Sequence, residues 1–124
     1  MIPLTPAIST WNITKIFPQK SKNKHVKAGT QKGKVVVDHV TLDIPQGEFF
    51  GLLGPNAAGK TTFTKMLVTL LLPDQGGAQV NGFDLLSKPA QVRSSIGYLH
   101  GEAGGRSLYW RLTGRDNLWF FAYL

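Results

Sequence analysis

The sequence lacks several features that define other classes of protein. It has no cysteine, which excludes disulfide bonds and suits the cytosol. Its longest mainly apolar stretch, Met66 to Leu72, is far shorter than the roughly 18 residues of a membrane-spanning helix. No secretion signal is recognisable, because the first basic residue is Lys15 and no apolar core precedes it. We therefore expect at most one domain, soluble or peripheral to a membrane.

Acidic residues are absent from the first 37 positions, and the net charge of +7 arises there. Seven lysines precede the first acidic residue, Asp38, whereas acidic and basic residues balance in the rest of the chain. The Lys-rich segment 18–34 predicts a solvated loop, which could also contact anionic lipid or nucleic acid. It has no interleaved aromatic residues for base stacking, so we expect no nucleic-acid partner and keep anionic lipid as a possibility.

A phosphate-binding loop is the most informative pattern that is present. The spacing Gly-x4-Gly-Lys-Thr is met by Gly54, Pro55, Asn56, Ala57, Ala58, Gly59, Lys60, Thr61 and Thr62. Glycines let successive backbone N–H groups point into one anion-sized nest. The lysine brings positive charge to the β- and γ-phosphates of a nucleoside triphosphate, and the threonine hydroxyl of position 61 suits the bridging Mg²⁺. The pattern predicts nucleotide binding.

The flanking segments fit such a loop. The apolar run from Phe49 to Leu53 predicts a buried strand before it. A helical stripe follows it, at Phe63, Met66, Leu67, Leu70 and Leu71, and Pro73 ends that helix. The phosphates would then lie at the N-terminus of the helix, where free N–H groups and the helix dipole favour anions.

The remaining segments predict a mixed α/β architecture in which antiparallel strands come first and strand–loop–helix units follow. Strands are expected at Ala7–Phe17, Val35–Ile44, Ala78–Val80 and Ser95–Leu99, with a short helix at Ser87–Arg93. Thr113 and Asp116 have the spacing of an N-cap pair that opens a final helix. That helix ends in the aromatic run 118–124, which needs something to cover it, either its own domain or further protein.

Several short sequence segments together resemble the nucleotide-binding domain of ABC transporters. They are Val40-Thr41-Leu42-Asp43-Ile44-Pro45-Gln46-Gly47-Glu48, Gly51-Leu52-Leu53-Gly54-Pro55-Asn56, Pro73-Asp74-Gln75-Gly76-Gly77, Asn81-Gly82-Phe83-Asp84 and Ile96-Gly97-Tyr98-Leu99. The stretch Thr113-Gly114-Arg115-Asp116-Asn117-Leu118 is similar to that of drug and polysaccharide exporters. The resemblance covers about residues 8–124 but only the first half of the family's domain. It implies a P-loop NTPase (RecA-like) core with an N-terminal antiparallel β subdomain, incomplete in this chain.

The resemblance also implies domain parts and roles for single residues. The whole of 1–124 would be a partial nucleotide-binding domain, with 18–34 as a loop insertion and 113–124 as the start of a helical subdomain. Phe17 lies near the family's adenine-stacking aromatic, although core packing is the alternative and Trp11 a second candidate. Ala57 replaces a usual glycine, which costs about 1–2 kcal/mol if the position needs a positive φ. Gly101 follows His100 where the family's Q-loop has Pro-Gln, and Glu102 is a substitute metal ligand or an exposed carboxylate.

The family's groups for hydrolysis are absent from this sequence. Phosphoryl transfer to water needs an Asp that holds the metal and a residue that orients the nucleophile. In the family both follow a signature motif of the LSGGQ type, and neither the motif nor an Asp-Glu run occurs after Lys60. We therefore expect a chain that binds Mg-ATP but hydrolyses it poorly by itself.

The resemblance implies an ATP-binding component of an exporter, peripheral on the cytoplasmic face of the membrane. Its partners would be a membrane permease and a second ATP-binding subunit. Two alternatives stay open at this point: a short non-catalytic nucleotide-binding module, and a soluble ABC ATPase that acts on nucleic acid.

Overall fold

The computed structural model describes residues 5–18, 33–99, 109 and 111–123, and the structural statements below concern these residues. The elements in chain order are β1 Ile8–Phe17, β2 Lys34–Ile44, α1 Lys60–Leu67, β3 Gln75–Val80, β4 Phe83–Asp84, α2 Pro89–Ser94 and α3 Gly114–Tyr123.

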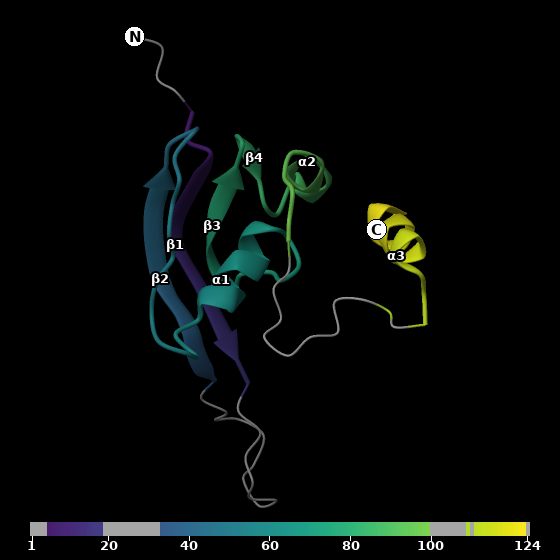
Figure 1. Ribbon diagram of the computed structural model, residues 1–124. Coiled ribbons are helices and arrows are strands. Elements are labelled where there is room, and N and C mark those ends of the chain that lie inside the picture. Colours follow the sequence, from purple (N-terminus) through teal and green to yellow (C-terminus); the bar gives the residue numbers. More distant parts are fainter. Residues whose placement is uncertain (1–4, 19–32, 100–108, 110, 124) are drawn as a thin grey trace, which may run out of the picture.

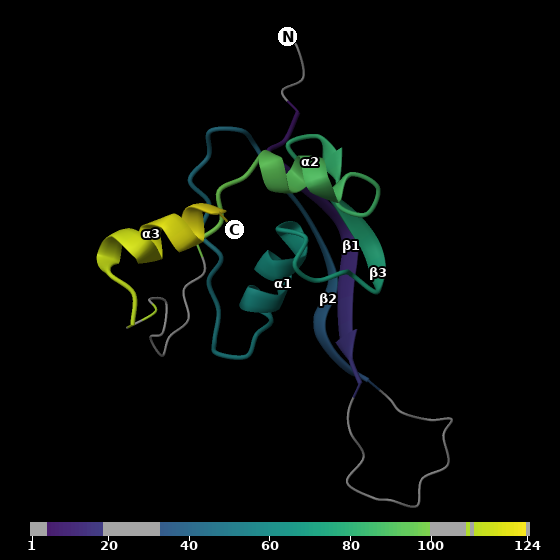
Figure 2. The same ribbon diagram turned by 90° about the vertical axis from the view of Figure 1, so that its right-hand side faces the viewer.

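The four strands form one antiparallel sheet in the order β2-β1-β3-β4. Ile8 at the start of β1 is opposite both Ile44 of β2 and Val80 of β3, so β1 is paired on both sides. Helix α1 packs against β2 and β3, and Figures 1 and 2 show it lying across one face of the sheet. The core between sheet and helices consists of Ile13, Val37, Phe63, Met66, Leu67, Ala78, Val80, Leu85 and Val92.

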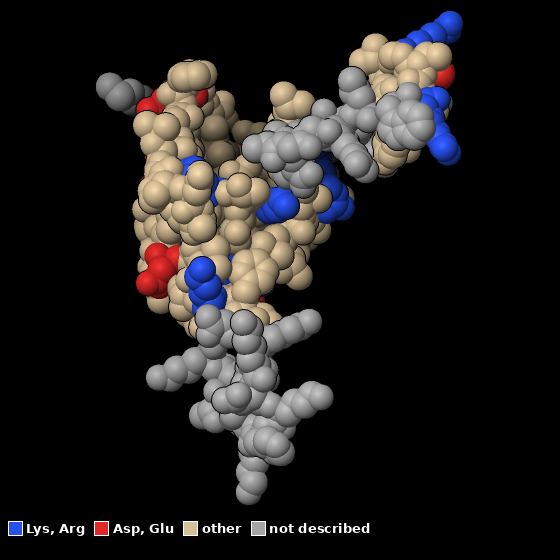
Figure 3. Space-filling view, turned by 60° about the horizontal axis from the view of Figure 1, so that its bottom comes forward, with Lys and Arg blue, Asp and Glu red and all other residues tan. Residues whose placement is uncertain are grey.

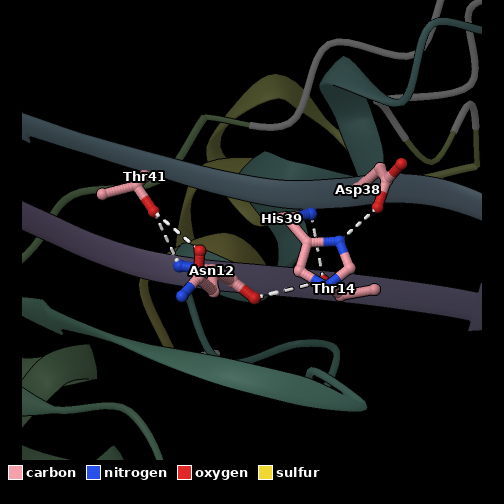
Figure 4. A network of polar contacts seen from close by, with 5 residues as sticks. All are labelled: Asn12, Thr14, Asp38, His39 and Thr41. Atoms are coloured by element: carbon pink, nitrogen blue, oxygen red, sulfur yellow. Dashed lines mark hydrogen bonds and ion pairs between the residues drawn. The ribbon is translucent and has the colours of Figure 1, made fainter.

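Both long strands are irregular where polar side chains replace regular pairing (Figure 4). Asn12 and His39 each have a φ of 47°, which an L-residue rarely adopts inside a strand. The Thr14 hydroxyl accepts the His39 N–H at 3.0 Å and donates to the Asn12 carbonyl at 3.1 Å. The Thr41 hydroxyl accepts the Asn12 N–H at 2.8 Å. These side chains satisfy backbone groups that the register shifts leave unpaired.

The N-terminal antiparallel subdomain, the helix after the P-loop, the strand near 78–80 and the helix near 87–93 are confirmed as elements. The strands predicted at 49–53 and 95–99 are wrong, because neither segment is a strand. Phe49 and Leu53 are exposed by 101% and 93%, and Leu99 by 94%. The physical reason is that a strand needs a neighbour for its N–H and C=O groups, and the described residues supply none for these two segments.

The predicted apolar stripe of α1 is also longer than the helix. Helix α1 ends at Leu67, and Leu70 is exposed by 61%. The chain turns at Thr69, whose φ is 61°, and the N–H groups of Leu70 and Leu71 both return to the Lys65 carbonyl. This turn closes the helix before Pro73 is reached.

The final helix begins as its N-cap pair predicts. The Thr113 hydroxyl accepts the Asp116 N–H at 3.2 Å and donates to the Asp116 carboxylate at 2.7 Å. The buried Asn117 side chain accepts the Tyr109 N–H and donates to the carbonyls of Tyr109, Leu112 and Thr113. Leu118 and Trp119 remain 75% and 54% exposed, so part of the aromatic run stays on the surface.

Candidate functional site: the phosphate-binding loop

Gly59 anchors the loop on the sheet at the point where α1 begins. It has a φ of 91° and is the N-cap residue of α1. A Cβ at this position would lie 2.3 Å from the Val36 carbonyl oxygen of β2 and 3.3 Å from a Val37 methyl. Only glycine combines this backbone conformation with so close an approach. The end of the loop is thereby pressed against the edge strand β2.

The Lys60 side chain closes the loop by bonding to the two residues at its start. Its ammonium group donates to the carbonyl oxygens of Gly54 and Pro55, both at 2.7 Å. These bonds hold the lysine Nζ inside the curve of the loop, where a phosphate would meet it. An anion entering the loop would find a positive charge already in place.

The N-terminus of α1 supplies further donors. Its hydrogen-bond ladder starts with Phe63 N–H to Gly59 C=O at 2.8 Å, so the preceding N–H groups have no partner within the helix. The helix dipole adds partial positive charge at this end, and the first turn holds no acidic residue. Thr61 is exposed in the same turn. Lysine charge, free amides and a hydroxyl therefore share one small region, as a triphosphate with Mg²⁺ requires.

Ala57 does occupy a left-handed conformation, with a φ of 63°. The condition under which alanine is unfavourable at this position is therefore met. The adjacent Ala58 is not among the positive-φ residues, and its N–H donates to the Pro55 carbonyl at 3.3 Å. The loop keeps its curled form in spite of the strain at one residue.

Phe17 ends β1 and is 38% exposed, opposite Lys34 of β2. The Lys15 ammonium lies 5.6 Å from the centre of its ring and also binds Asp74 at 3.1 Å. Trp11 lies farther back along β1, and its ring packs over Gly77, where a Cβ would be 2.7 Å from the ring. Phe17 therefore stays the candidate for the base, whereas the Trp11 ring faces another strand.

The sequence analysis did not identify Lys15 and Asp74 as neighbours of Phe17. Lys15 could have been found, because the alternation of a strand places residues 15 and 17 on the same face. Asp74 is different, because it reaches β1 only through the fold.

Two further predictions lie outside the described residues. Glu102 is one of them, and the other is most of the Lys-rich loop, 19–32. On the face shown in Figure 3, the described Lys and Arg side chains are spread over several places and form no single broad patch. Within the described part of the chain, no group of three His, Asp or Glu side chains could hold a metal ion.

A hollow of about 470 Å³ lies beside the loop but is not formed by it. It is lined mainly by apolar residues of the start of β1, the end of β2, segment 47–52 and α1, and by none of residues 54–62. It adjoins the segment 49–53 that has no strand partner. Its lining suits apolar side chains and not a triphosphate.

Comparison with known proteins decides the family. The family model described as ABC transporter matches residues 37–120, which include the whole phosphate-binding loop. This chain belongs to the ABC transporter ATP-binding family. It is 47% identical over 95 residues to the ABC transporter ATP-binding protein NatA of Bacillus subtilis (strain 168), which covers 75% of the chain. It is 53% identical over 66 residues, 52% of the chain, to the doxorubicin resistance ATP-binding protein DrrA of Mycobacterium tuberculosis (strain ATCC 25618 / H37Rv).

The family members that it matches are longer. The chain spans 38% of NatA and 20% of DrrA. The fold agrees with a solved structure described as the ATP-binding subunit of an ABC transporter, with a TM-score of 0.63 at 24% identity, over 94% of this chain and 42% of that one. Together with the family match, this likeness confirms an incomplete P-loop NTPase domain with an antiparallel β subdomain. Among the residues that the structure describes, none forms a helix long and apolar enough to cross a membrane.

Proposed function

We propose that this chain forms the nucleotide-binding part of an ABC exporter's ATP-binding subunit. The observation that carries the proposal is the Lys60 ammonium held inside a P-loop that Gly59 fixes on β2. In this proposal the backbone of 54–62 cradles the β- and γ-phosphates and Lys60 neutralises their charge. Phe17 provides the face on which adenine stacks.

Mg²⁺ would be held by the Thr61 hydroxyl together with the phosphates, and its charge would offset theirs. The residues of this chain bind and orient the nucleotide, while the groups that activate water belong to the part of the family domain that this sequence does not include. The 124 residues alone would hydrolyse ATP poorly, and the intact protein would hydrolyse it to drive transport.

Export and the partners also belong to the proposal. DrrA is named for doxorubicin resistance, and the Escherichia coli (strain K12) relative YbhF, 47% identical over 85 residues, is named a probable multidrug ABC transporter ATP-binding protein. These names support export as the direction of transport. The subunit would work at the cytoplasmic face of the membrane with a permease and a second ATP-binding subunit.

The test is the affinity for Mg-ATP of the Lys60→Ala variant, measured by calorimetry. Loss of a charge-assisted contact to phosphate weakens binding by about 1.5–3 kcal/mol, so we expect the Kd to rise more than tenfold. Lys65→Ala is the matched control, because Lys65 lies in the same helix and its ammonium has no ion pair among the described residues. An unchanged Kd for Lys60→Ala would overturn the role assigned to this lysine.

A further inference from the structure

Asp74 connects the end of β1 to the chain that leaves α1. Its own N–H donates to the Thr14 carbonyl at 2.9 Å, and its carboxylate accepts the Ile16 N–H at 2.7 Å. The pairing of β1 with β3 stops at Thr14 opposite Gln75, so the last residues of β1 have no strand on that side. The Asp74 carboxylate thereby replaces a strand partner and holds the tip of β1 in line.

Lys15 joins this carboxylate to the Phe17 ring. Its side chain is only 13% exposed, and its ammonium binds Asp74 Oδ1 at 3.1 Å while lying over the ring at 5.6 Å. A cation at this distance is attracted by the electron-rich face of an aromatic ring. One face of Phe17 is therefore in contact with a positive charge that is itself held by Asp74.

The same end of the sheet adjoins the phosphate-binding loop. Gly59 is pressed against Val36, and the neighbouring Val35 and Val37 pair with Ile16 and Lys15. Adjacent strands lie roughly 4.8 Å apart, so the tip of β1 is separated from Gly59, at the end of the loop, by about the width of one strand. A ring placed there is in reach of the base when the phosphates occupy the loop.

We infer that Lys15 and Asp74 are positioning residues that present the Phe17 ring to the nucleobase. Asp74 fixes the strand tip and orients Lys15, and Lys15 covers one face of the ring so that the base stacks on the other. The inference rests on the proposed nucleotide function, and it assigns to this pair the part of the affinity that comes from the base.

The experiment compares the binding of Mg-ATP with that of Mg-tripolyphosphate, which has the phosphates but no base. Both affinities are measured by calorimetry on the full-length protein, and the readout is the ratio of the two dissociation constants. Lys15→Met keeps the apolar stem and removes the charge, and we expect it to reduce the preference for ATP by about three- to tenfold. Asp74→Asn should act in the same direction, Lys15→Arg should retain the preference, and the affinity for tripolyphosphate should stay unchanged in all three.

Lys34→Met is the matched control, since Lys34 lies opposite Phe17 but has no ion pair or cation–π contact in the described part of the chain. If both Lys15→Met and Asp74→Asn keep the preference of the original protein, the inference is overturned and the proposed function stands. If ATP and tripolyphosphate weaken equally, the pair is only structural and the inference also fails. If the original protein binds neither ligand, the proposed function fails and the inference fails with it.

Discussion

At the scale of single residues, the phosphate-binding loop combines one required and one unfavourable backbone conformation. Gly59 and Ala57 both have positive φ, at 91° and 63°. Glycine adopts such values without steric cost, whereas alanine brings its Cβ close to the following carbonyl. The strain at Ala57 is local and belongs to the backbone, so it should respond to substitution at that position alone.

Replacing Ala57 with glycine should therefore stabilise the protein. Relief of a left-handed alanine is worth about 1–2 kcal/mol, and the greater freedom of glycine in the unfolded chain offsets roughly half of it. We expect a gain of about 0.5–1 kcal/mol in the free energy of unfolding in urea. Ala58→Gly is the control and should lose about 0.5–1 kcal/mol, because Ala58 has no positive φ to relieve. Equal effects of the two substitutions would contradict the assignment of strain.

At the scale of elements, the loop and the edge strand β2 depend on each other through one close contact. Helix α1 packs on β2 and β3, and Gly59 brings the start of that helix against the Val36 carbonyl. The loop is curved because its two ends are fixed, by Lys60 on the Gly54 and Pro55 carbonyls and by Gly59 on the sheet. Loss of this contact should therefore displace the N-terminus of the helix.

Gly59→Ala tests this dependence. The added methyl would meet the Val36 oxygen at 2.3 Å in a backbone conformation that alanine resists, so the loop must shift. We expect a loss of about 2 kcal/mol or more in stability, together with a large fall in Mg-ATP affinity. Gly97→Ala is the control, because a Cβ there meets nothing within 4 Å and φ is not positive. A fully active Gly59→Ala variant would show that the close approach is not needed.

At the scale of the whole molecule, two aspartates join parts of the chain through their ionised carboxylates. The backbone N–H of Ile16, with help from Lys15, lowers the pKa of Asp74 below its ordinary 3.8. The backbone N–H of Ser87, together with the Ser87 hydroxyl, lowers the pKa of Asp84. Asp74 links the exit of α1 to β1, and Asp84 closes the turn before α2. Both carboxylates therefore favour the folded state when they are charged.

The sign of the pH dependence follows from these depressed pKa values. Their contribution is fully present above the unfolded value of 3.8 and is lost as the pH falls through the lower folded values. We expect the midpoint of urea unfolding to decrease as the pH is lowered below 3.8, and the decrease to be smaller in the double variant Asp74→Asn, Asp84→Asn. Glu48→Gln is the control, because Glu48 is exposed and has no ion pair within the described part of the chain. The same slope in the double variant and the original protein would contradict this account.

The sequence by itself determined the phosphate-binding loop, the antiparallel strands, the N-cap of α3 and the family, because each depends on residues close together in the chain. A turn, a cap or an alternation pattern is a local interaction and can be read locally. The strands predicted at 49–53 and 95–99 were wrong, because an apolar segment forms a strand only beside another strand.

Only the tertiary structure decided how distant residues meet. It placed Gly59 against Val36, and it brought Asp74 to the tip of β1 across a separation of 58 residues from Ile16. It also showed that Ala57 has a positive φ. The two long-range contacts depend on the combined shape of several elements and not on any one stretch of sequence.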